Sequence, residues 1–298
     1  MKFYTLSPEG VPENQVLFPL LRPEFEKQGH SFTRKPYQAD IILIDLHTRI
    51  ADYNQDDVDY IIDSCKPICT WDEFDKGGMS SLKWPYPITD QQSKIFMHIA
   101  QNNIKAVHFC RLLDKTQKLP ENLFPYEKSV SYQEPPVSKE ELFNREWDIV
   151  FIANHAPSRQ LISDAINNDG RLKCLTMIGA EKISFEKFVE IHKTGKLFIS
   201  SAAGGFTDER VQCLFSISGI IRQRTDQLVK DDFTHLENCL RIDSPPTKKD
   251  LDDIYEIVNN KDRLYEIYMN GYNFVKEHYS EQYFAQYYLD TMKKEGII

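Results

Sequence analysis

The stretch that decides the fold runs from Lys196 to Gln223 and reads KLFISSAAGGFTDERVQCLFSISGIIRQ. Its apolar run Leu197–Ile199 is typical of a buried strand, and the small residues Ala202–Gly205 let the backbone turn sharply or approach a ligand. Apolar residues at helical spacing follow, and Gly219 is placed to end that helix before a second apolar run. The pattern therefore predicts a strand, a glycine turn, a helix and a strand in succession.

The predicted helix start carries charged residues beside the glycine turn. Asp208 and Glu209 precede Arg210, so all three lie in or before the first helical turn. A helix start offers free N–H groups and a positive dipole end to an anion such as a phosphate. Two readings stay open for these residues: they contact a ligand, or the carboxylates cap the helix and pair with Arg210 in a βαβ unit that binds nothing.

The amino-terminal half alternates strands with helices. Strands are predicted at Lys2–Leu6, Ala39–Leu46, Pro67–Trp71 and Lys105–Phe109. Helices are predicted at Gln15–Gln28, Asp56–Cys65 and Gln91–Gln101. This alternation favours a mostly parallel sheet with right-handed crossovers, and ligands of such sheets gather at the carboxyl ends of the strands.

The segment from Glu146 to Ile298 resembles the carboxy-terminal half of GT-B glycosyltransferases, the group 1 and exostosin-like or CgeB-like relatives. Trp147–Arg159 is similar to the first strand and phosphate-side loop of that half. The glycine turn, the helix start with acidic residues and arginine, Phe233, Asn238-Cys239-Leu240 and an aromatic final helix follow in the order of that family. The resemblance implies an α/β fold with two Rossmann-like domains facing a cleft, and a C-terminal helix that crosses back to the N-terminal domain.

The predicted boundaries follow from composition and from this resemblance. Residues 120–141 are rich in Pro, Ser and Glu and are interpreted as the connection between domains, with the boundary near Ser138. We expect an acceptor-side domain at 1–137, a nucleotide-sugar-binding domain at 138–278 and the returning helix at 279–298. The length agrees, since 298 residues at roughly 150 per domain suggest two domains. Aromatic residues of the last helix are predicted to brace the N-terminal domain: Phe284, Tyr287 and Tyr288.

Candidate site residues are those expected at the carboxyl ends of strands. In the second half they are Asn154, His155 and Arg159, together with Gly204, Gly205, Asp208, Glu209 and Arg210 at the glycine turn. The resemblance implies that this group binds the diphosphate of a nucleotide-sugar donor, with Arg159 and Arg210 as bidentate contacts. In the first half the candidates are Asp45, Asp72 and Asp75, with His47 nearby. One of these carboxylates would accept the acceptor's proton in an inverting reaction, whereas a retaining reaction needs no protein base.

The sequence departs from the family pattern at two positions. Many of these enzymes carry two acidic residues eight apart, and counting back from Gly219 places Gly205 and Cys213 there. Neither accepts hydrogen bonds as a carboxylate does. Two alternatives therefore stay open beside glycosyl transfer to a hydroxyl acceptor such as a glycan. One is a nucleotide-sugar epimerase or other phosphosugar enzyme on the same scaffold, and the other is a catalytically inactive relative that binds a nucleotide or a partner.

Charge, apolar runs and cysteine spacing narrow the classes of protein to which the chain can belong. The net charge of −9 argues against sequence-independent binding to nucleic acid, which needs a basic surface. The longest apolar runs are too short to span a bilayer, and the amino terminus lacks the features of a signal peptide. The six cysteines include no CxxC pair and are typical of a reduced, cytoplasmic protein. The resemblance implies no metal and no cofactor, because basic groups and helix dipoles hold the diphosphate.

Overall fold

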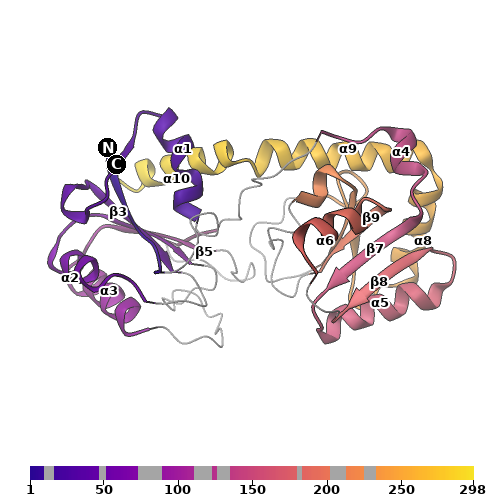
Figure 1. Ribbon diagram of the computed structural model, residues 1–298, viewed down its shortest axis with the longest axis horizontal. Helices are drawn as coiled ribbons and strands as arrows, with labels where there is room; N and C mark the ends of the chain where they lie inside the picture. Colours follow the sequence, from indigo (N-terminus) through magenta and orange to yellow (C-terminus); the bar gives the residue numbers. More distant parts are fainter. Residues whose placement is uncertain are drawn as a thin grey trace. The chain divides into compact units, whose positions relative to one another are not determined.

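A computed structural model describes residues 1–9, 17–46, 52–72, 89–110, 123–125, 135–179, 183–201, 213–224 and 233–298. The chain divides into two compact units (Figure 1). The first includes Met1–Ser129 and Glu281–Ile298, and the second includes Val130–Thr225 and Asp231–Ser280. Each unit is built around its own parallel sheet.

The first unit has a six-stranded sheet in the order β2-β1-β3-β4-β5-β6, and every pairing is parallel. Its strands are β1 (Lys2–Leu6), β2 (Ser31–Phe32), β3 (Ile41–Leu46), β4 (Ile68–Asp72), β5 (Ala106–Cys110) and β6 (Leu123–Pro125). Its described helices are α1 (Leu17–Lys27), the 3₁₀ turn η2 (Pro36–Gln38), α2 (Gln55–Asp63), α3 (Asp90–Gln101) and α10 (Glu281–Lys294). The predicted alternation of strands and helices in this half is confirmed.

Local sequence signals explain where these elements begin and end. All six residues of β3 are buried, as expected of a central parallel strand covered on both faces. The Asn54 side chain caps α2 by accepting from the N–H of Asp57, and Thr89 forms a capping box with Gln92 at the start of α3. Gly29 ends α1 with φ of +83°, a conformation that side-chain-bearing residues rarely adopt.

The second unit has a five-stranded parallel sheet in the order β11-β10-β9-β7-β8. Its strands are β7 (Trp147–Ala153), β8 (Cys174–Ile178), β9 (Gly195–Ser200), β10 (Gly219–Gln223) and β11 (Leu240–Ile242). Its described helices are α4 (Lys139–Phe143), α5 (Pro157–Asp169), α6 (Phe185–His192), the 3₁₀ turn η3 (Cys213–Ser216), α8 (Lys248–Asn259) and α9 (Lys261–His278). Aliphatic residues of β7, β9, β10 and β11 form one core with α5, α8 and α9.

Gly219 has a different role from the one its sequence position predicted. It is the first residue of β10 rather than the end of a helix, and the described residues just before it form the 3₁₀ turn η3. A Cβ on Gly219 would lie 2.7 Å from Cδ2 of Leu197 on the neighbouring strand β9. The glycine therefore allows close packing between the strands, because a Cβ here would force the end of the Leu197 side chain to shift.

The predicted connection at 120–141 is also partly wrong. Residues 123–125 form β6 and pair with His108–Cys110 of β5, so this part belongs to the first sheet. Ser138 is the N-cap residue of α4, because its hydroxyl accepts from the N–H of Glu141. Proline-rich composition misled the prediction, since a strand at the edge of a sheet tolerates a proline such as Pro125.

The last helix belongs to the first unit, as the predicted fold required. Phe284 and Tyr288 of α10 are fully buried. The Tyr288 ring lies 4.3 Å from that of Phe109 in β5 and 6.0 Å from that of Phe18 in α1, in edge-on geometry. Aromatic edge contacts of this kind add to the free energy gained from apolar burial. The C-terminal helix is therefore part of the first unit's core (Figure 1).

Across the ranges that the structure describes, no helix is both long enough and apolar enough to cross a membrane.

Candidate functional site

The carboxyl edge of the second sheet collects the polar residues of the candidate site. Because all five strands run in parallel, the residues that follow them lie at one edge of the sheet. These residues are Asn154 and His155 after β7, Gly179 after β8, Ser201 after β9, Arg224 after β10 and Asp243 after β11. The sequence predicted the first two of them.

Arg159 lies in the first turn of α5 and contacts the ends of two neighbouring strands. Its Nε donates to Oγ of Ser201 at 2.8 Å, and its Nη1 donates to the backbone oxygen of Asn154 at 3.1 Å. Ser201 follows β9 and Asn154 follows β7, and these strands pair with each other. The guanidinium that the sequence assigned to this position is therefore held at the middle of the carboxyl edge.

The start of α5 adds a positive dipole end at the same place. Ala156 is the N-cap residue and has no side chain that can accept a hydrogen bond, while Pro157 occupies the first helical position. The N-terminal partial charge of α5 is thus not offset by a capping carboxylate or by any acidic residue in the first turn. Together with the Arg159 guanidinium, this arrangement favours an anion.

Gly179 lies at the carboxyl end of β8, beside the end of β7. Its N–H donates to the backbone oxygen of Ala153 at 2.9 Å, and its φ of +70° is favourable only for glycine. A Cβ at this position would lie 3.3 Å from the Cβ of exposed His155. Sequence reasoning missed Gly179, because it did not predict the strand β8 that this glycine follows.

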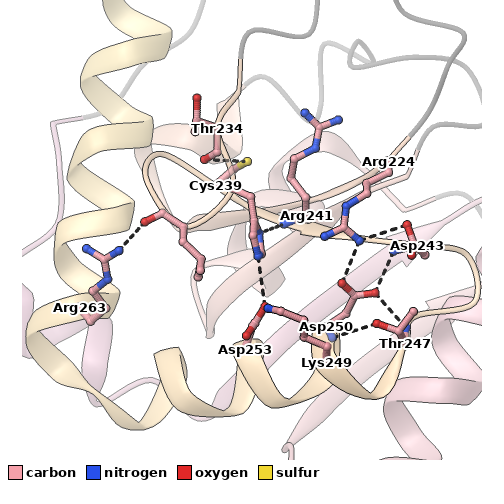
Figure 2. Close-up of polar contacts among 12 residues, drawn as sticks. Arg224, Thr234, Cys239, Arg241, Asp243, Thr247, Lys249, Asp250, Asp253 and Arg263 are labelled. Atoms are coloured by element: carbon pink, nitrogen blue, oxygen red, sulfur yellow. Dashed lines mark hydrogen bonds and ion pairs between the residues drawn. The ribbon is translucent and has the colours of Figure 1, made fainter.

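The buried carboxylate of Asp250 contacts the residues that follow β10 and β11 (Figure 2). The Asp250 side chain is 3% exposed, and its Oδ1 accepts from Nη1 of Arg224 at 2.9 Å. Its Oδ2 accepts the backbone N–H groups of Asp243 and Thr247 at 3.2 and 2.9 Å. Burial alone would raise the pKa of Asp250, but these hydrogen bonds outweigh burial and lower it. The carboxylate is therefore charged and structural.

The loop after β11 connects this carboxylate cluster to the start of α5. The Ser244 hydroxyl donates to the backbone oxygen of Ser158 at 3.0 Å, one residue before Arg159. The guanidinium of Arg224 also pairs with Asp243 at 3.1 Å. The whole carboxyl edge is thus linked by hydrogen bonds, and neither Ser244 nor Asp250 was predicted from the sequence.

The loop 233–239, which carried part of the family resemblance, has a packing role in this structure. Arg263 of α9 donates to the backbone oxygen of Leu236 at 2.6 Å, and the N–H of Arg241 donates to Nδ1 of His235 at 2.9 Å (Figure 2). Gly271 lets the loop lie directly on α9, because a Cβ there would be 2.7 Å from the backbone oxygen of Asn238. These contacts hold the loop against α9 and against β11.

In the first unit, Asp45 and Asp72 lie near the carboxyl edge of the sheet. Asp45 is fully buried, and its Oδ2 accepts from Oγ of Ser7 at 3.2 Å. The Tyr53 hydroxyl donates to the backbone oxygen of Asp45 at 2.6 Å. Asp72 ends β4 and pairs there with Leu46 of β3.

Several predicted residues lie outside the described ranges. They are His47, Asp75, Gly204, Gly205, Asp208, Glu209 and Arg210. Within the described ranges, no group of three or more His, Cys, Asp or Glu side chains is arranged to hold a metal ion.

Comparisons with known proteins identify the fold. No family model and no curated protein sequence matches the chain. Among solved structures, Anabaena HepE in complex with UDP matches with a TM-score of 0.58 and 11% identity, over 99% of this chain and 100% of HepE. HepE in complex with UDP-glucose matches with a TM-score of 0.55, 9% identity and the same coverage. TarM matches with a TM-score of 0.51 and 13% identity, over 84% of this chain and 54% of TarM.

The fold is that of the GT-B glycosyltransferases. The match to HepE extends over both units, whereas the sequence resemblance covered only the second half. The GT-B fold therefore accounts for the two parallel sheets and for the C-terminal helix that belongs to the first unit. The predicted α/β fold with two Rossmann-like domains is confirmed.

Proposed function

We propose that the protein is a metal-independent glycosyltransferase that moves a sugar from a nucleotide-sugar donor to a hydroxyl acceptor. The GT-B fold supports this proposal, as do the two HepE structures that match the chain along nearly its whole length, one with UDP and one with UDP-glucose. The observation that carries it is the placement of Arg159 at the uncapped start of α5, in the middle of the carboxyl edge of the second sheet.

The donor's diphosphate fits this edge by charge and by geometry. A guanidinium presents a planar set of N–H donors that matches phosphate oxygens, and the start of α5 adds a positive partial charge. On sequence grounds the proposal adds the glycine turn Gly204-Gly205 and the charged residues Asp208, Glu209 and Arg210 to the donor contacts. Asn154 and His155 flank the same helix start.

The chemical step joins the acceptor oxygen to the anomeric carbon of the sugar. The bond from that carbon to the phosphate oxygen breaks, and the nucleoside diphosphate leaves. In an inverting reaction the acceptor's proton passes to a carboxylate, for which Asp45, Asp72 and Asp75 are the candidates. In a retaining reaction a phosphate oxygen of the leaving group takes the proton. Positive groups at the donor edge stabilise the leaving diphosphate in both cases.

Turnover is the direct test of this function. A thermal-shift screen of UDP, GDP, ADP and CMP sugars selects the donor, and release of the nucleotide is then measured with and without a panel of sugar acceptors. We expect nucleotide release that depends on the acceptor and persists in EDTA, since cationic side chains and helix N–H groups replace the metal.

The other outcomes each point to a different function. Conversion of the donor to its epimer without an acceptor would identify an epimerase. Binding without any turnover would identify an inactive relative. Loss of activity in EDTA that manganese or magnesium restores would overturn the metal-independent proposal and bring Asp72 and Asp75 forward as metal ligands.

Replacing Arg159 by alanine is expected to weaken donor binding by about 1–3 kcal/mol, the range for losing a hydrogen bond to a charged group. Isothermal titration with UDP-glucose, or with the donor chosen by the screen, measures the change. Arg171→Ala is the matched control, because Arg171 lies just beyond the other end of α5 and pairs with Asp169 and Asp252. We expect the control to bind normally, and the same loss in Arg210→Ala. Unchanged affinity in Arg159→Ala would remove this residue from the donor site.

A further inference from the structure

The contact between Arg159 and Ser201 suggests a role for a residue that the sequence did not single out. Ser201 immediately follows β9, and its side chain is almost completely buried at the carboxyl edge. Its Oγ accepts the Nε–H of Arg159 at 2.8 Å. Strands β7 and β9 pair in the register Ile149↔Leu197, so the residues after their ends lie beside each other. A short hydroxyl side chain on one strand end can therefore reach an arginine that begins the helix after the other.

Among the residues that the structure describes, two acceptors orient this guanidinium. Ser201 Oγ accepts a hydrogen bond from Nε, and the backbone oxygen of Asn154 accepts one from Nη1 at 3.1 Å. A guanidinium on a long, flexible stem loses rotamer entropy when it binds a ligand. Ordering it before the ligand arrives reduces that loss, and a planar donor set recognises phosphate only in the correct orientation. The serine thus acts on binding through the arginine.

We propose that Ser201 is a positioning residue that orients Arg159 toward the diphosphate of the bound nucleotide. This inference rests on the proposed function, because it takes the ligand of Arg159 to be a nucleoside diphosphate. Asn154 contributes only its backbone oxygen, which no substitution at that position removes. Of these two acceptors, Ser201 is the one whose side chain a substitution can remove, and in the sequence it directly precedes the predicted glycine turn at Ala202–Gly205.

The test measures the affinity for a nucleoside diphosphate and, separately, the affinity for the nucleoside alone. UDP, GDP and ADP are titrated against the wild-type protein, and the tightest binder is compared with its own nucleoside. Ser201→Ala is expected to weaken nucleoside diphosphate binding about twofold to tenfold, the effect of one lost hydrogen bond, and to leave nucleoside binding unchanged. Ser201→Thr keeps the hydroxyl and is expected to retain most of the affinity. Melting temperatures of all variants establish that they are folded.

A double substitution separates this inference from the proposed function. In an Arg159→Ala background, Ser201→Ala is expected to have no further effect, because the serine acts through the arginine. If Arg159→Ala weakens binding and Ser201→Ala does not, the positioning role is wrong and the diphosphate site stands. An equal loss of nucleoside and nucleoside diphosphate binding in Ser201→Ala would also refute the role. If Arg159→Ala binds normally, or if no nucleoside diphosphate binds, the proposed donor site and this inference fail together.

Discussion

Removal of α10 is expected to unfold the first unit and abolish turnover. Phe284, Tyr288, Leu289 and Met292 of this helix are all fully buried. Loss of one large core side chain costs about 2–5 kcal/mol, and proteins of ordinary stability have only about 5–15 kcal/mol in total. The deletion should begin at Glu281, because Tyr279 packs against Phe233 in the second unit. Melting temperature and nucleotide release are compared in the full-length and truncated proteins.

A point substitution tests the same packing without removing the helix. Tyr288→Ala is expected to lower the free energy of unfolding by about 3–5 kcal/mol, since its ring packs against Phe109 and Phe18. Gln286→Ala on the exposed face of α10 is the control, and we expect it to melt like the wild type, because Gln286 is exposed and its side-chain amide donates to Asp290 on the same helix. A truncated protein with normal melting and turnover would show that α10 is not part of the first unit's core.

The sequence predicted the strands β1, β3, β4 and β5 and the helices between them because the local pattern and the packing agree there. Five of the six residues in the β3 run IILIDL are apolar because both faces of the strand are buried, and the residues Leu197–Ile199 lie in β9 for the same reason. The prediction failed where a residue has two possible uses. Gly219 looked like a helix end, but its small size serves the contact with Leu197. The position of the neighbouring strand β9 decides between these two roles of the glycine. That position cannot be read from a single sequence.

The candidate site was predictable only in part, for a similar reason. Asn154, His155 and Arg159 were found because each follows the predicted strand β7 along the chain. Ser201 lies 42 residues from Arg159, and Ser244 lies 86 residues from its partner Ser158. Such pairs depend on the strand order β11-β10-β9-β7-β8, which composition and spacing do not specify. Whether the residues at the glycine turn bind the donor stays a prediction.

Loss of the Asp250 carboxylate is expected to be among the most destabilising single changes in the second unit. Its side chain accepts two backbone N–H groups and the Arg224 guanidinium, and it completes the capping box of Thr247 at the start of α8. Asp250→Ala leaves the N–H groups of Asp243 and Thr247 without this acceptor. We expect a fall of about 2–4 kcal/mol in the free energy of unfolding, from a lost cap together with unsatisfied donors. Urea denaturation measures it.

Two further measurements distinguish this role from a general effect of charge. Asp252→Ala removes a carboxylate from the same helix, but Asp252 is 40% exposed and pairs with Arg171 and Lys248, so we expect little change. The folded state lowers the pKa of Asp250, so its carboxylate stabilises the protein above the ordinary aspartate pKa, and this contribution is lost as the pH falls through the lowered value. The stability difference between the wild type and Asp250→Asn should therefore shrink below about pH 4. A difference that stays constant down to pH 2, or an equal loss in Asp252→Ala, would contradict the assignment of Asp250 as the charged centre of this edge.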